Sequence, residues 1–283
     1  EELKEKKDLV LHATKVTDML EAARSVLPVL SENGYLVSMQ NGICEDELAG
    51  IIGRERIMGC VTGWGATMES RGRLVMTSTG DFILGYPAGE ADDDLKTVAD
   101  VLSAVVPVRI SNNIMGHLYS KLIINANITS LGVICGLGLG KMLSIKKIRK
   151  IFIEIIREAV ELADKMNIRI EVFGGRLDFR KFIRGDSFLS DFRRHLMIRI
   201  IGFKYRRLKS SSLQSFERGK PTEVDFLNGY IVRNAEKLGV DVPVNSAILS
   251  MIHEIEQGKR KISPDNFESP VFDRFNNRIL KTS

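Results

Sequence analysis

Cysteine and histidine are scarce in this chain of 283 residues. The three cysteines, Cys44, Cys60 and Cys135, lie far apart, and no two of them have the C-x-x-C spacing of a zinc or redox site. The four histidines do not cluster either. These absences argue against a metal centre and a disulfide framework, and they favour a reduced, cytoplasmic protein.

Long hydrophobic runs are also lacking. The longest stretch of low charge, residues 122–140, is interrupted by two asparagines and four glycines, which argues against a membrane span. The first residues, EELKEKKDLVLHATK, do not form a signal peptide, because their apolar stretch is short and follows mixed charges. The net charge of +5 suits anionic small molecules as well as nucleic acid and does not choose between them. We therefore expect a soluble protein.

The length of the chain and a change of pattern near residue 111 predict two domains. Before that point, strand-like runs such as DLVLHAT alternate with helical periodicity, as in VTDMLEAARSVLPVLSENG, whose helix we expect to stop at Asn33-Gly34. This alternation predicts a parallel sheet with crossover helices. Residues 72–87 look like two antiparallel strands with a turn at Thr79-Gly80.

After Ser111 the pattern indicates helices only. The clearest is residues 144–167, with Ser144 as the expected N-cap, and residues 222–238 and 245–257 also have helical periodicity. The predicted architecture is therefore an α/β sheet domain over residues 1–111, followed by an all-helical domain over residues 112–283.

The apolar stretch LYSKLIINANIT would carry one polar stripe if it is helical. His117, Lys121, Asn125 and Thr129 are four residues apart and share a face. A lysine among isoleucines is costly to bury, so it either reaches water or has partners and a task. The stripe is then either the wet side of an amphipathic helix or the wall of a cleft.

Polar residues also follow two of the predicted strands. Gln40 and Asn41 close one strand and Lys15 follows the previous one, at the edge where open α/β sheets bind ligands. On the sequence alone, an ordinary turn is the simpler explanation of Asn41-Gly42, and a solvated lysine at a helix start is the simpler explanation of Lys15.

Two further segments have competing interpretations. Glu223 is expected in the first turn of a helix capped by Thr222, where an acid stabilises the helix dipole without any other function. Residues 193–209 carry seven basic residues and no acid, which indicates either a solvated helix face or a surface for a polyanion or an anionic lipid.

Taken together, several segments resemble the ketopantoate reductase (2-dehydropantoate 2-reductase) family. They are ATKVTDMLEAARSVLP, QNGICEDEL, GATMESRGRLVMTSTGDFILG, SKLIINANIT and SSLQSFERGKPTEVDFLNG, and the resemblance covers roughly residues 9–257. It implies a Rossmann-type NADP domain joined to a helical domain, with the active site in the cleft between them. It also implies that the polar stripe is a wall of that cleft.

The resemblance implies a role for eight residues. Lys121 matches the catalytic lysine. Substrate-binding positions are matched by Asn125, Ser211 and Thr129. Cofactor-binding or adjoining positions are matched by Lys15, Asn41, Ala66 and Glu223.

The implied activity is NADPH-dependent reduction of a 2-oxo acid, above all 2-dehydropantoate to pantoate in pantothenate and coenzyme A biosynthesis. The implied setting is a cytoplasmic enzyme without nucleic-acid or membrane partners, paired as a homodimer through its helical domain. Two alternatives stay open: a non-catalytic or truncated binding protein of the same fold, and a reductase of a different 2-oxo acid.

The sequence departs from the family pattern in two places. Thr129 stands where the family carries a second asparagine, which could mean a changed substrate. The chain also has no G-x-G-x-x-G that follows a strand, because GLGLGK at residues 136–141 has the wrong spacing and place. We therefore expect the first βαβ half of the Rossmann sheet, with its pyrophosphate site, to lie upstream of this sequence.

Overall fold

The computed structural model describes residues 5–206 and 208–275. The chain divides into two compact units, one of residues Glu1–Lys121 with Arg169–Arg176 and one of Leu122–Ile168 with Leu177–Ser283. The first unit therefore includes the start of a long helix that the sequence pattern assigns to the helical domain. The domain division at residue 111 stays a prediction.

The first unit is built on a five-stranded sheet in the order β1-β2-β3-β6-β7. Its strands are β1 (Lys7–His12), β2 (Leu30–Ser38), β3 (Ile57–Thr62), β6 (Phe82–Gly85) and β7 (Val108–Ile110). β1, β2 and β3 are mutually parallel, β3 and β6 are antiparallel, and β6 and β7 are parallel again. The carboxyl ends of β1, β2 and β3 consequently share one edge of the sheet.

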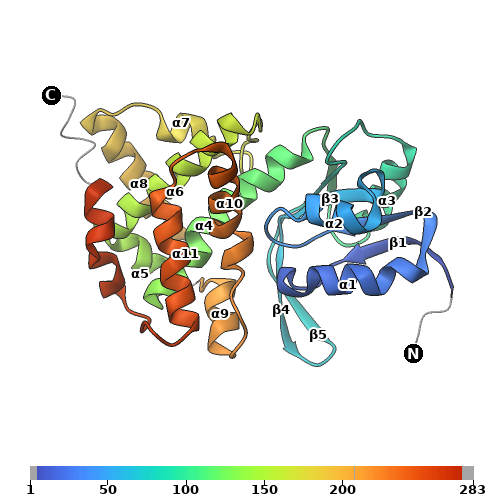
Figure 1. The fold of residues 1–283 in the computed structure, drawn as a ribbon, viewed down its shortest axis with the longest axis horizontal. Coiled ribbons are helices and arrows are strands. Elements are labelled where there is room, and N and C mark those ends of the chain that lie inside the picture. Colours follow the sequence, from blue (N-terminus) through green and yellow to red (C-terminus); the bar gives the residue numbers. More distant parts are fainter. Residues whose placement is uncertain (1–4, 207, 276–283) are drawn as a thin grey trace. The chain divides into compact units, whose positions relative to one another are not determined.

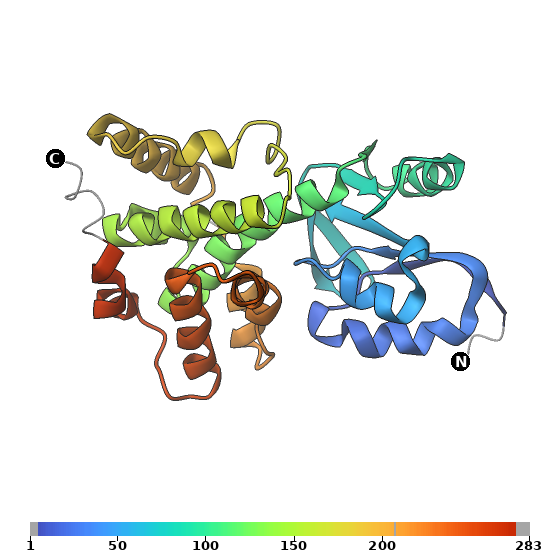
Figure 2. The same cartoon turned by 45° about the horizontal axis from the view of Figure 1, so that its top comes forward.

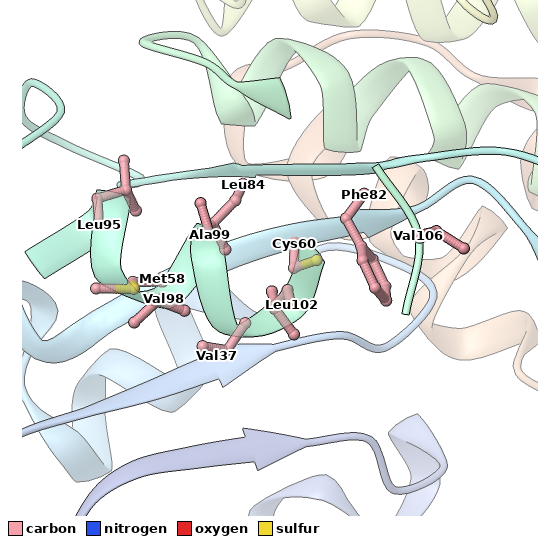
Figure 3. Packing of buried hydrophobic residues seen from close by; sticks show 10 residues of the cluster. All are labelled: Val37, Met58, Cys60, Phe82, Leu84, Leu95, Val98, Ala99, Leu102 and Val106. Atoms are coloured by element: carbon pink, nitrogen blue, oxygen red, sulfur yellow. The ribbon is translucent and has the colours of Figure 1, made fainter. Parts of the chain in front are cut away.

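Helices cover both faces of this sheet (Figures 1 and 2). α1 (Met19–Val26) and α2 (Glu45–Ile52) lie on one face, and α3 (Asp93–Ser103) lies on the other. α3 begins where the Asp92 carboxylate accepts the N–H of Leu95 at 2.9 Å. Its apolar side packs onto alternate residues of β2, β3 and β6, as Figure 3 shows. The expected α/β alternation is confirmed in this unit.

The first helix ends earlier than its periodicity predicts. α1 stops at Val26 and a 3-10 turn, Leu27–Val29, follows it, because Pro28 lacks the N–H that would continue the helix. Asn33-Gly34 therefore lies inside β2 and is not the helix stop. A glycine is needed there, since a Cβ on Gly34 would stand 2.9 Å from the carbonyl oxygen of Lys7 on β1.

The expected hairpin with a turn at Thr79-Gly80 is wrong. β4 (Gly65–Ser70) and β5 (Arg73–Ser78) pair as a separate two-stranded ribbon. Their turn lies at Arg71-Gly72, where Gly72 has φ +78° and supplies the left-handed conformation that a tight turn requires. The strand after Gly80 is β6, which joins the main sheet beside β3.

The second unit is helical, as the sequence predicts. It contains most of α4 (Ile114–Cys135), then α5 (Leu139–Ser144), α6 (Lys146–Lys165), α7 (Phe179–Ile183), α8 (Phe188–Lys204), α9 (Ser211–Glu217), α10 (Asn228–Leu238) and α11 (Pro243–Glu256), with 3-10 turns at Val224–Phe226, Pro264–Glu268 and Pro270–Phe275. α6 packs against α5, α7, α8, α10 and α11 and forms the centre of the unit (Figure 1).

Two helix starts differ from the expected ones. Ser144 does not cap α6; it ends α5 and donates its hydroxyl hydrogen to the carbonyl of Lys141. α10 begins at Asn228 and not at residue 222, because a 3-10 turn precedes it.

α4 is long and apolar enough to cross a membrane, but 78% of its most apolar window is buried inside the protein. Asn127 is completely buried and donates to the carbonyl of Ile123 at 2.9 Å, one turn back on the same helix. α4 is therefore a core helix.

A buried polar network joins four helices of the second unit. Ser130 on α4 donates to Asn228 on α10, whose amide nitrogen donates to Asn245 on α11 at 2.9 Å. Glu158 on α6 accepts from the N–H groups of Val244 and Asn245 at 2.8 and 2.9 Å, and from the Asn245 side chain at 2.7 Å. These contacts hold the first turn of α11 against α6, because they satisfy N–H groups that a helix start leaves unpaired.

Candidate active site

The predicted site residues of the first unit lie near the edge of the sheet at which the parallel strands end. Lys15 follows β1, and Asn41 follows β2. Since His12 and Ser38 are in register at the ends of these two strands, the segments that carry Lys15 and Asn41 leave the sheet side by side. Lys15 is exposed and Asn41 is half-buried.

Lys121 reaches this same edge from α4. Its Nζ donates to the carbonyl oxygen of Thr62, the last residue of β3, at 3.0 Å, and its side chain is half-buried. Glycine in β3 makes this approach feasible, because a Cβ on Gly59 would stand 3.1 and 3.2 Å from Ile114 and Leu118 on α4. The structure thus brings the ammonium group to the strand ends where a ligand of an open α/β sheet binds.

Gln40 is a buried network residue, which the plain turn interpretation did not foresee. Its Oε1 accepts from the Ser38 hydroxyl at 3.2 Å, and its Nε2 lies 2.6 Å from Nδ1 of His12. Burial lowers the pKa of His12, so the imidazole is neutral and Nδ1 can accept from the Gln40 amide. The turn that follows uses Gly42, whose φ is +95°.

The neutral polar groups here suit the nicotinamide end of a dinucleotide, whose carboxamide needs donors and acceptors and no full charge. Nε2 of His12 lies 3.5 Å from the Thr14 hydroxyl, so the network extends to the start of the β1–α1 connection. No glycine-rich strand–turn–helix that would hold a pyrophosphate occurs within residues 5–206 or 208–275. The residues present therefore fit one half of the expected cofactor.

Ala66 lies on the ribbon that leaves this edge. It is half-buried in β4 and pairs with Met76 on β5, four residues after β3 ends. Nearby, Trp64 packs edge-on against Phe82 with ring centroids 5.8 Å apart, which anchors the start of the ribbon on the sheet.

Asn125 lies one turn beyond Lys121 on α4, so the two side chains share a face of one helix. A further turn on, Thr129 is buried, and its carbonyl accepts from the Ser210 hydroxyl at 3.4 Å. A Cβ on Gly132 would stand 2.7 Å from that hydroxyl oxygen, so the glycine lets the start of α9 lie close to α4. Ser211, exposed in the first turn of α9, belongs to this contact region.

Glu223 does not lie in the first turn of an α-helix, so the helix-dipole explanation for it is wrong. It precedes the 3-10 turn Val224–Phe226, and its side chain is buried, with 5% exposed. Thr222 does accept from a backbone N–H, that of Val224, at 3.3 Å.

The eight predicted site residues divide between the units. Lys15, Asn41, Ala66 and Lys121 belong to the first, and Asn125, Thr129, Ser211 and Glu223 belong to the second. Their assigned roles stay predictions. Sequence reasoning missed His12, Ser38 and a buried glutamate, Glu45, because each looks unremarkable until neighbouring strands bring them together.

The basic stretch is only partly a solvated face. Arg194 is buried and donates to the carbonyls of Ile183 and Gly185 at 3.2 and 2.8 Å, and Lys209 is paired with Glu217. Arg207 lies outside the described residues. α8 also carries a row of exposed large apolar side chains: Phe188, Leu189, Phe192, Leu196, Ile200 and Phe203. We call this row the α8 apolar face.

Two family models match the chain. "Ketopantoate reductase PanE/ApbA" matches residues 1–89, and "Ketopantoate reductase PanE/ApbA C terminal" matches residues 113–256. A curated relative, the 2-dehydropantoate 2-reductase of Archaeoglobus fulgidus, is 26% identical over 252 residues, which are 89% of this chain and 77% of the relative.

Solved structures have the same fold. The crystal structure of a PanE/ApbA family ketopantoate reductase from Ralstonia eutropha matches with a TM-score of 0.75 at 26% identity, covering 91% of this chain and 78% of that one. D-mandelate dehydrogenase, in a ternary structure with NADH and anilino(oxo)acetate, matches with a TM-score of 0.76 at 20% identity, covering 91% and 79%.

Proposed function

This chain belongs to the ketopantoate reductase family of oxidoreductases, and we propose that it reduces a 2-oxo acid with NADPH, foremost 2-dehydropantoate to pantoate. The observation that carries the proposal is the position of Lys121. Its ammonium group lies at the carboxyl end of β3, and the Asn125 amide follows one turn later on the same face of α4.

Reduction of a ketone requires a hydride at the carbonyl carbon and a proton at its oxygen. A reduced nicotinamide supplies the hydride. Lys121 donates an N–H to the carbonyl oxygen, stabilises the negative charge that develops there and transfers the proton. Asn125, Ser211 and Thr129 hold the substrate by neutral hydrogen bonds, which orient it without competing with the charge of Lys121.

Four residues are proposed to contact or adjoin the cofactor. Asn41 holds the nicotinamide end, Lys15 approaches a cofactor phosphate or ribose, Ala66 contacts it through the ribbon, and Glu223 completes the polar network of the site. We propose NADP over NAD from the family resemblance. The three cysteines are all buried and are not joined in disulfides, and we propose a reducing compartment, the cytoplasm.

A reductase of another 2-oxo acid is the nearest alternative, because Thr129 replaces an asparagine of the family pattern. A smaller hydroxyl in that position leaves room for a bulkier or less polar substituent. A binding protein that has kept the fold and lost the chemistry is the other alternative.

Titration of the full-length protein with NADPH, followed by nicotinamide fluorescence, separates the two reductase proposals from a binding protein that has lost the cofactor site. Saturable binding, together with weaker binding of Asn41→Ala, is the expected result. Exposed Asn33, which is distant in sequence from the strand end, provides the control Asn33→Ala. Absence of saturation up to millimolar NADPH would exclude both reductase proposals.

We also propose that the protein is a homodimer paired through the α8 apolar face. The exposed fractions of Phe192 and Ile200 are 57% and 58%, and large apolar side chains that gather on one helix at such exposure mark an interface.

Ile200→Glu is expected to convert the dimer to a monomer, because an acid in the middle of an apolar interface loses its hydration without gaining a partner. Sedimentation velocity measures the change. Leu238→Glu, at a 47% exposed position on α10, is the control and should remain dimeric. A monomeric wild-type protein, or a dimeric Ile200→Glu variant, would rule out this interface.

A further inference from the structure

A fully buried acid lies next to the candidate nicotinamide site. Glu45 is the first residue of α2, and its side chain is 2% exposed. Its Oε2 accepts the N–H of Cys44 at 2.9 Å. Burial raises the pKa of Glu45 to about 7, although hydrogen bonds from the backbone and from Ser38 oppose the rise.

The hydrogen bonds of Ser38 and Gln40 decide which form of Glu45 fits. Ser38 lies within hydrogen-bond reach of the Glu45 carboxyl, and it also donates to Oε1 of Gln40 at 3.2 Å. A serine hydroxyl has a single hydrogen to donate. If that hydrogen goes to Gln40, the contact between Glu45 and Ser38 must be donated by a protonated carboxyl.

The hydrogen bonds then continue in the same donor-to-acceptor order along the ends of the strands. Gln40 donates through Nε2 to Nδ1 of His12 at 2.6 Å, and the other nitrogen of His12 carries the hydrogen that faces the Thr14 hydroxyl at 3.5 Å. Every buried acceptor in this series has a donor only when Glu45 holds a proton, because the single Ser38 hydrogen cannot serve both Gln40 and a Glu45 carboxylate.

We propose that Glu45 is a positioning residue for the cofactor: its protonated carboxyl completes the series Glu45, Ser38, Gln40, His12 and thereby fixes the Gln40-Asn41 segment in the form that binds the nicotinamide end. The inference rests on the proposed function. When Glu45 loses its proton, the Ser38 hydroxyl turns to the carboxylate, and Oε1 of Gln40 is left buried without its donor.

Among the described groups of this series and its surroundings, Glu45 is the group that titrates near neutrality. On α2 the neighbouring charge is exposed Asp46, and on β3 it is the Cys60 thiol, whose pKa burial raises to about 12. Lys121 of α4 interacts with Cys60, while the α4 residues that face Gly59 are apolar. Burial keeps His12, on β1, neutral.

Cofactor affinity should therefore fall as pH rises through about 7, the pKa of Glu45. One buried hydrogen bond contributes roughly a three- to tenfold change in affinity. Glu45→Gln carries an amide that donates to Ser38 at every pH, so its NADPH affinity should stay near the low-pH value of the wild type from pH 6 to 8.5.

Ser38→Ala interrupts the series and should bind NADPH weakly at every pH. Asp46→Asn is the matched control, because Asp46 is exposed and paired with Arg54. It should keep the size of the wild-type pH effect, with the midpoint moved to lower pH, since the Asp46 charge raises the pKa of Glu45. A wild-type affinity that is constant through pH 7, or a Glu45→Gln profile that equals the wild-type profile, would overturn the positioning role while leaving the reductase proposal intact. Failure of every variant and of the wild type to bind NADPH would overturn both.

The proton on Glu45 can also be measured without cofactor. A folded-state pKa of about 7, above the ordinary 4.5, means that the folded protein takes up a proton that the unfolded chain releases. The contribution of Glu45 to stability is therefore fully present below pH 4.5 and is lost as pH rises to about 7. The unfolding free energy of Glu45→Gln relative to the wild type should rise over this range. A constant difference would show that Glu45 does not titrate there and would overturn the proposal.

Discussion

Lys121→Ala is expected to lower turnover of a 2-oxo acid by roughly two to four orders of magnitude, the usual contribution of a general acid. The substitution removes both the proton donor and the positive charge beside the carbonyl oxygen. NADPH affinity should change little, because the proposed contacts of the nicotinamide end come from the strand connections. Turnover, NADPH affinity and melting temperature should be measured on one preparation of the full-length variant.

Lys165→Ala is the matched control, since this lysine is exposed at the end of α6 and remote in sequence from the proposed site. Its truncation should be nearly silent in all three measurements. Loss of the bond from the charged Lys121 to the Thr62 carbonyl should cost no more than about 1.5–3 kcal/mol of stability. Near-normal turnover of Lys121→Ala would mean that the polar stripe of α4 is only the solvated side of an amphipathic helix.

Glu158→Ala is expected to lower the free energy of unfolding by about 3–5 kcal/mol, because each buried donor left unsatisfied costs about 1–3 kcal/mol. The carboxylate accepts from Val244 and twice from Asn245, so its loss leaves three buried N–H donors unpaired at the start of α11. Asn245 also accepts from Asn228, so the damage extends to α10. Urea denaturation measures the effect.

Glu161→Ala provides the comparison, because Glu161 lies one turn further along the same helix and is exposed. The free energy of unfolding of Glu161→Ala should remain within about 0.5 kcal/mol of the wild-type value. Equal midpoints for the two variants would mean that the buried network contributes little to the stability of the helical unit.

Local patterns in the sequence predicted most of the elements. A strand-length apolar run identified β1, and helical periodicity identified α6 and α11. The errors arose where a single backbone constraint outweighed the pattern. Pro28 ended α1 although the apolar period continued, and Gly72 supplied a turn that allowed β5 to pair with β4.

Part of the candidate site was also predictable from local patterns in the sequence. The spacing of Lys121 and Asn125 is local, so their shared helix face followed from the sequence. Glu45 looks like a surface acid in a run of three, and only the packing of α2 and β2 buries it beside Ser38. Partners that lie far apart in the sequence leave no periodic signal.

The most direct test of the account is consumption of NADPH, followed at 340 nm, by the full-length protein with a panel of branched 2-oxo acids. The account predicts that NADPH is oxidised only when a 2-oxo acid is present, most rapidly with 2-dehydropantoate, and that the product is the corresponding 2-hydroxy acid. Absence of turnover with every member of the panel, from a folded protein that binds NADPH, would contradict it.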